Sequence, residues 1–224
     1  MWILNAVKSG DYITLFLTLA TRILVLLTIN PLHEVAHGWV AMKLGDPTAK
    51  FRGRLTFNPL VHLNKMGALF LILFGFGWAN PVPVNPLYFK NRKKGMVLTA
   101  IAGSISNILA AIAGAFVYYL LAYLGLLGNY WLRYFMSSFI IINISLAVFN
   151  LLPMPPLDGS RIFAAILPDR INMLMYRYEK YIQLVLLALL FMGTLDPILD
   201  TLQGKALQIV LFVAGLPFKI TGLI

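Results

Sequence analysis

The stretch PLHEVAHGWV, residues 31–40, contains two of the three histidines of the chain, four residues apart around a glutamate. It lies inside a longer segment, about 12–44, that otherwise has the apolar character of a membrane helix. Within a bilayer only helices and closed barrels satisfy every backbone polar group, and ionisable side chains are costly there. We therefore expect a helical membrane protein in which these polar side chains have a functional role.

The composition of the whole chain agrees with a membrane location. Of its 224 residues, 60% are hydrophobic and 12% are charged, whereas soluble domains are about 45–50% apolar and about 25% charged. Three long stretches, residues 66–89, 95–132 and 134–157, contain no charged side chain. Since one helical crossing needs about 20 apolar residues, the sequence predicts an all-α polytopic membrane protein.

The hydrophobic segments predict five to six transmembrane helices, one of them a short re-entrant segment. The short segment is 66–78, which is brief for a crossing and is followed by the proline-rich NPVPVNP. Pro31 is expected to kink the first span or to start a new helical piece. We also expect a short strand at RLTF, residues 54–57. The predicted full spans are 12–44, 96–123, 132–152, 181–199 and 206–222.

The basic residues predict the orientation of the chain. The net charge is +10, and most Lys and Arg residues fall in 43–65, 90–94 and 161–180. Because such residues collect in short cytoplasmic loops, we expect the amino terminus outside, and the HEVAH and PPLDG ends of their spans on the cytoplasmic side. Contact with anionic lipid headgroups explains the charge, so no nucleic-acid partner is expected.

The histidine pair predicts a metal site. On a helix, residues four apart lie on one face about 5–6 Å apart, so His33 and His37 can bind one ion. Glu34 lies beside that face and is placed to act as a base. The chain has no cysteine, which leaves histidine and carboxylate as ligands for zinc. The alternative is that both histidines are hydrogen-bonded polar residues of a helix bundle.

A zinc centre in an enzyme needs a third protein ligand. Asp158 is the best candidate, because it follows an uncharged span that is broken by three prolines, where irregular backbone can line a cavity. The alternative for Asp158 is helix capping. His62 lies in a loop, where a structural role is more common.

These motifs resemble those of the site-2 protease family of intramembrane zinc metalloproteases. HEVAH and NLLPMPPLDG match its two signatures, and LGDPTAKFRGRLTFNPLVHLN, GWANPVPVNP and AGSISN resemble its short prokaryotic branch, which has no PDZ domain. Two departures from the family pattern are Asn80, where many relatives have lysine, and Ser104, where many have proline. The resemblance implies a single membrane-embedded metalloprotease domain over 1–224. Its three-helix catalytic core would be about 12–159, with C-terminal helices at about 160–224.

The resemblance also implies roles for individual residues. His33, His37 and Asp158 would bind one zinc ion per chain, and Glu34 would be the catalytic base. Asn107 and Asn150 would contact the substrate or the transition state, although interhelical hydrogen bonding would also explain them.

The function implied is regulated cleavage of membrane proteins at or near a transmembrane helix. The expected partners are those substrates and the lipid bilayer of the cell membrane, and the chain could also form a homo-oligomer. Two other functions stay open: a divalent metal-ion carrier and a catalytically inactive membrane scaffold.

Overall fold

The computed structural model describes residues 10, 12–74 and 77–221, and every regular element in these ranges is a helix. Four of the described helices are long and apolar enough to cross a membrane. This confirms the predicted all-α polytopic fold. The four are listed by their bounds: Tyr12–Lys43, which comprises α2, η1 and α3, then α7 (Arg92–Tyr123), α8 (Tyr130–Asn150) and α12 (Asp196–Ile220).

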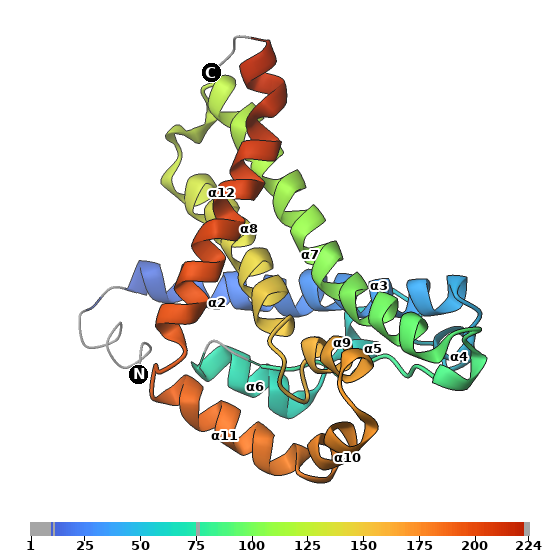
Figure 1. Cartoon of the computed structure of the whole chain (residues 1–224). Coiled ribbons are helices and arrows are strands. Elements are labelled where there is room, and N and C mark those ends of the chain that lie inside the picture. The colour runs from blue at the N-terminus through green and yellow to red at the C-terminus, as the bar shows by residue number, and fades with distance from the viewer. Residues whose placement is uncertain (1–9, 11, 75–76, 222–224) are drawn as a thin grey trace.

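The first span is built from three pieces that follow one another in a line (Figure 1): α2 (Tyr12–Leu24), the π-helical turn η1 (Val25–Ile29) and α3 (Asn30–Lys43). Pro31 lies in the first turn of α3, as expected for a residue that has no N–H to donate. The wider turn of η1 precedes it, and the N–H of Asn30 bonds back to the carbonyl of Val25. The span therefore continues past the proline, with HEVAH in its second half.

The remaining helices of the described chain are short. They are α4 (Thr48–Phe51), α5 (Pro59–His62), α6 (Lys65–Phe74), η2 (Pro86–Tyr88), η3 (Leu126–Gly128), α9 (Asp158–Ile166), α10 (Asp169–Arg177) and α11 (Glu179–Phe191). In Figure 1, α6, α9, α10 and α11 lie on one side of the α2–α3 line, opposite the far ends of α7, α8 and α12. The 10-residue α6 is too short to cross a bilayer, as predicted for segment 66–78.

Two predicted segments have different limits in the structure. The span expected at 181–199 is the 13-residue α11, which ends at Phe191, so it is short for a crossing. Gly193 has a φ of +68° and turns the chain, a conformation that glycine adopts without steric cost. The helix expected at 206–222 then begins ten residues earlier, at Asp196.

The strand expected at 54–57 is wrong, since the described backbone there is bent and forms no ladder. Local bonds take the place of a partner strand. The hydroxyl of Thr56 accepts from the N–H of Asn58, and its carbonyl accepts from Nε2 of His62. The guanidinium of Arg54 donates to the carbonyls of Val61 and Asn80, which lie in other segments.

The central helix α7 packs against α3, α8, α9 and α12. Small residues on α7 allow its neighbours to approach closely, as is usual between membrane helices. One buried cluster joins α7, α8 and α12 through Ala111, Ala115, Ile140, Ile144, Val210 and Ala214. On another side, α7 packs against α3, the half of the first span that contains HEVAH.

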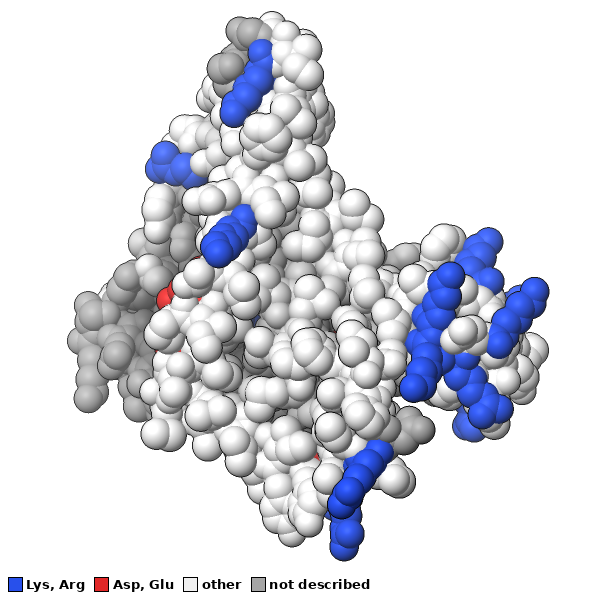
Figure 2. Space-filling model, viewed as in Figure 1, with Lys and Arg blue, Asp and Glu red and all other residues white. Residues whose placement is uncertain are grey.

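Lys and Arg side chains gather at the end of the molecule where α3 ends, α4 lies and α7 begins (Figure 2). Lys43 ends α3, Lys50 belongs to α4, and Arg92, Lys93 and Lys94 open α7. Basic residues from two of the three predicted clusters, 43–65 and 90–94, are therefore neighbours in space. Their location on the cytoplasmic side of the membrane stays a prediction.

Candidate metal centre

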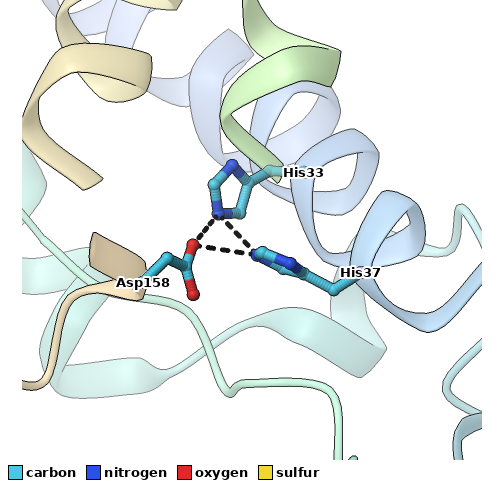
Figure 3. A group of neighbouring side chains, drawn as sticks. All are labelled: His33, His37 and Asp158. Carbon is cyan, nitrogen blue, oxygen red and sulfur yellow. Dashed lines mark hydrogen bonds and ion pairs between the residues drawn. The ribbon is translucent and has the colours of Figure 1, made fainter. Parts of the chain in front are cut away.

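Three potential ligand atoms meet at one point in the structure (Figure 3). Nε2 of His33 and Nε2 of His37 lie 3.0 Å apart, and Oδ2 of Asp158 lies 3.1 Å from the first and 3.0 Å from the second. All three side chains are buried, with exposed fractions of 9%, 5% and 9%. Residues 125 positions apart in the sequence thus form one compact group.

The arrangement of these atoms fits a zinc ion. Nδ1 of His37 lies 2.7 Å from the carbonyl of Thr99, and a carbonyl can only accept, so Nδ1 carries the proton and Nε2 presents a lone pair. A tetrahedral zinc with bonds of about 2.0–2.1 Å holds neighbouring donors about 3.3 Å apart. Small side-chain rotations would reach that spacing. Three protein donors leave one position for water or substrate, as in zinc enzymes.

The carboxylate of Asp158 is in the form that binds a metal. Burial alone would raise the pKa of this group, but hydrogen bonds and charge interactions with His33 and His37 outweigh burial, so the pKa lies below its usual range. A carboxylate with a lowered pKa stays ionised at neutral pH.

The backbone before Asp158 explains how it reaches the histidines. After α8 ends at Asn150, the proline-rich residues 151–157 form turns, and α9 begins at Asp158 itself. A Cβ on Gly159 would lie 2.3 Å from the carbonyl oxygens of both Leu151 and Leu152, so only glycine fits this tight return. The carboxylate bonds to the histidines, which argues against the capping alternative.

Glu34 is held beside the ligand atoms by an extended segment. Its Oε2 accepts a 2.8 Å hydrogen bond from the N–H of Val82. Val82 belongs to residues 79–85, which we call the 79–85 segment and which runs without helical structure up to the start of η2. Glu34 lines the same cavity as the three ligand residues, and its hydrogen-bond partner comes from the backbone.

Polar contacts fix both ends of the 79–85 segment. At one end, Arg54 donates to the carbonyls of Asn80 and Pro81, at 2.7 and 3.2 Å, and also to that of Val61. At the other end, the N–H of Asn85 donates to Asp46, which is fully buried, at 2.7 Å. Sequence reasoning assigned neither residue to the site. The pattern LGDPTAKFRGR contains both, and the burial of a charge in such a loop requires a defined partner.

A cavity of about 370 Å³ opens over the ligand atoms. The 79–85 segment, α8 and α11 enclose it, and most of its lining is apolar. The residues of α11 that line the cavity are polar near the start of the helix, where Glu179 and Gln183 lie. Further along they are apolar, at Leu186, Leu187 and Leu190. A peptide segment placed here would lie against Glu34 and the three ligand residues.

Both predicted asparagines line this cavity. Asn107 is fully buried on α7, and its Nδ2 lies 3.3 Å from Nδ1 of His33. Asn150 ends α8, and its Nδ2 donates to the carbonyl of Leu146 at 2.9 Å.

His62, considered above from the sequence, and Arg22, a charged residue within the first span, lie elsewhere. His62 is buried and bonds to the carbonyl of Thr56 at 2.8 Å, outside the ligand group. Arg22 donates to the carbonyl of Ile72 at 2.6 Å and so joins α2 to α6.

Comparison with known proteins agrees with this geometry. The model of a family described as Peptidase family M50 matches residues 125–193, a range that includes Asn150 and Asp158. "Putative zinc metalloprotease YwhC" of Bacillus subtilis (strain 168) is 41% identical over 171 residues, which cover 75% of this chain and 78% of that protein. "Putative zinc metalloprotease Rip2" of Mycolicibacterium smegmatis is 28% identical over 167 residues, 69% of this chain and 59% of that protein. No solved structure matched the chain.

Proposed function

The chain belongs to peptidase family M50, the site-2 protease family, and we propose that it is a zinc endopeptidase that cuts other membrane proteins within or next to a transmembrane helix. The observation that carries the proposal is the convergence of His33, His37 and Asp158 beside Glu34, in a cavity between apolar helices. The catalytic core is about 12–159, and the site faces the cytoplasm.

His33, His37 and Asp158 hold one zinc ion in this proposal. A zinc ion bound there would supply Lewis acidity to the scissile carbonyl and to the attacking water. Glu34 takes the proton of that water while the water oxygen bonds to the carbonyl carbon. The same carboxylic acid then passes its proton to the amide nitrogen as the C–N bond breaks, which leaves a carboxylic acid and an amine. Transfer of the product acid's proton to the amine gives the carboxylate and ammonium products.

Asn107 and Asn150 line the cavity in which the peptide would lie. A side-chain amide there can donate to a substrate carbonyl, or to the oxygen on which negative charge develops. The N–H of Val82 keeps the carboxylate of Glu34 at the wall formed by the 79–85 segment.

The 79–85 segment offers a place for an unwound substrate. In the part of the chain that the structure describes, the N–H of Val84 has no hydrogen-bond partner, whereas the N–H groups of Asn80, Val82 and Asn85 each have one. An extended peptide can add to such an edge through main-chain hydrogen bonds. A helix must unwind locally before its peptide bond can reach the base, and pairing of this kind would stabilise the unwound form.

Replacement of Glu34 by glutamine tests the proposal. Purified wild type and Glu34→Gln are reconstituted with a panel of single-span membrane proteins, and Asp200→Asn, an exposed carboxylate on α12, serves as the matched control. Since general base catalysis contributes about 10²–10⁴-fold, Glu34→Gln should nearly abolish cleavage while it keeps zinc and folding, and Asp200→Asn should cut normally.

The opposite result would favour another function. Cleavage by Glu34→Gln at the wild-type rate would exclude the proposed mechanism. Zinc flux across proteoliposomes that depends on His33 and Asp158 would instead indicate a metal-ion carrier.

A further inference from the structure

One face of α7 lies directly against the two histidines of α3. Thr99, Gly103 and Asn107 are spaced by four residues, so they form one stripe along the helix. Thr99 and Asn107 are both 0% exposed. A Cβ on Gly103 would lie 2.4 Å from Nε2 of His37 and 2.5 Å from Cε1 of His33. The backbone of α7 therefore touches both imidazole rings.

The stripe fixes the ring of His37 through a main-chain group. The carbonyl of Thr99 lies 2.7 Å from Nδ1 of His37. Because this acceptor requires a proton on Nδ1, it sets both the tautomer and the direction of Nε2. Ligating histidines usually donate their other ring N–H in this way.

The ring of His33 has Asn107 in the equivalent place, two turns further along α7. Nδ2 of Asn107 lies 3.3 Å from Nδ1 of His33. Its Oδ1 is buried and has no hydrogen-bond partner among the residues that the structure describes. The amide can present either end to the ring by a half-turn about its last side-chain bond. If Nε2 of His33 is to bind a metal, Nδ1 must carry the proton, and Oδ1 of Asn107 is then its acceptor.

We propose that Asn107 is a positioning residue, which orients the imidazole of His33 toward the metal as the carbonyl of Thr99 orients His37. This inference rests on the proposed zinc site and extends it to α7. Asn107 would act through His33, in addition to any contact that its amide makes with a substrate.

Zinc affinity tests the proposal without reference to cleavage. Purified protein is stripped of metal, and its zinc affinity is measured by competition with a chelator. The absorption spectrum of the Co²⁺-loaded protein reports the ligand geometry. The variants are Asn107→Leu, which removes the acceptor, and Asn107→Asp, which keeps it. Asn107→Ala, which adds no bulk, gives the same test if Asn107→Leu does not fold.

Asn143 offers a closely matched control. It is also 0% exposed, its Oδ1 also lacks a partner in the described part, and its Nδ2 donates to the carbonyl of Phe139 at 2.9 Å. It lies on α8 and does not line the cavity. Asn143→Leu therefore reproduces the loss of a buried amide in the same fold but away from the histidines.

Loss of such a partner of a ligating histidine typically costs 10–100-fold in metal affinity, so Asn107→Leu and Asn107→Ala should weaken zinc binding by about that factor and alter the Co²⁺ spectrum. Asn107→Asp and Asn143→Leu should bind zinc nearly as wild type does. Wild-type affinity in Asn107→Leu, or an equal loss in Asn143→Leu or in Asn107→Asp, would overturn the inference.

The two proposals can fail separately. If the wild type itself bound no zinc, the proposed function would fail. If Asn107→Leu kept its zinc affinity while Glu34→Gln abolished cleavage, only the role of Asn107 would be lost.

Discussion

The main-chain N–H of Val82 donates to Oε2 of Glu34 over 2.8 Å. This bond joins the 79–85 segment to the helix that carries the two histidines. It also gives the proposed base a fixed position through the backbone. A backbone donor cannot be removed by the usual replacement with alanine, but proline removes it.

We expect Val82→Pro to lower kcat. Proline deletes the N–H, and a hydrogen bond to a charged group is worth about 1.5–3 kcal/mol, so the rate should fall by about 10–100-fold. Zinc content should not change, because Glu34 is not among the grouped ligand atoms. Steady-state kinetics on a cleavable single-span protein, with zinc measured in the same samples, would check this.

Val84→Pro is the companion variant, because it removes an N–H that would pair with the substrate and not with the base. We expect it to raise KM and to leave kcat near the wild-type value. If Val82→Pro raised only KM, the bond to Glu34 would have no part in the chemical step.

The metal content of ligand variants is the second prediction. His37→Ala and Asp158→Ala should lose zinc, while Glu34→Gln should keep it. His62→Ala is the control, because it removes a buried histidine that lies outside the ligand group. Elemental analysis of the purified proteins measures the outcome. Full zinc occupancy in Asp158→Ala would show that Asp158 is not a ligand.

A methyl group at position 103 should displace both histidines. The Cβ of Gly103→Ala would overlap His37 and His33 at 2.4–2.6 Å, so zinc affinity should fall sharply. Gly114→Ala on the same helix is the comparison, since its Cβ would meet the ring of Phe139 at 2.8 Å. That variant should lose thermal stability at most. A zinc titration of both variants measures the difference in zinc affinity. Equal zinc affinities would refute close packing of α7 on the ligands.

The orientation in the membrane can be tested with single cysteines, because the chain has none of its own. Lys93 lies at the start of α7, and Asn129 precedes α8. The positive-inside rule places Lys93 in the cytoplasm and Asn129 on the opposite side. Impermeant maleimide applied to intact cells should therefore label position 129 and not position 93. Labelling of both from outside would contradict the proposed topology.

Sequence reasoning succeeded where a side chain and its spacing carry the information. The i, i+4 histidines and the lone aspartate after three prolines predicted a group that the structure assembles from α3 and α9. The helical class followed from composition. These features depend on residue type, which is read directly from the chain.

It failed where backbone geometry decides. The turn at Gly193 lies inside the segment predicted as one span, 181–199, and the prediction placed no break at the sequence GTLDP, so it missed the limits of α11 and α12. The carbonyl of Thr99 and the N–H of Val82 belong to no side chain: any residue could have supplied the carbonyl, and any residue except proline the N–H. Arg54 was counted only as a basic loop residue, because its carbonyl partners lie up to 27 positions away.

The π-helical turn η1 affects the rotational phase of the first span. One stripe of buried residues along this span recurs at every fourth position: Leu17, Thr21, Val25, Ile29, His33, His37 and Ala41. In an ideal α-helix four residues turn through about 400°, so such a stripe would wind steadily around the axis. A wide turn advances less per residue and counteracts this drift midway. Because the wide turn holds one residue more than an α-turn, deletion of one residue from η1 would leave the histidines in nearly the same rotational phase relative to α2. Deletion of one residue from α3 ahead of His33 would instead rotate them by about 100°, and the ligands could then face the core only if α2 turned its own buried face to lipid.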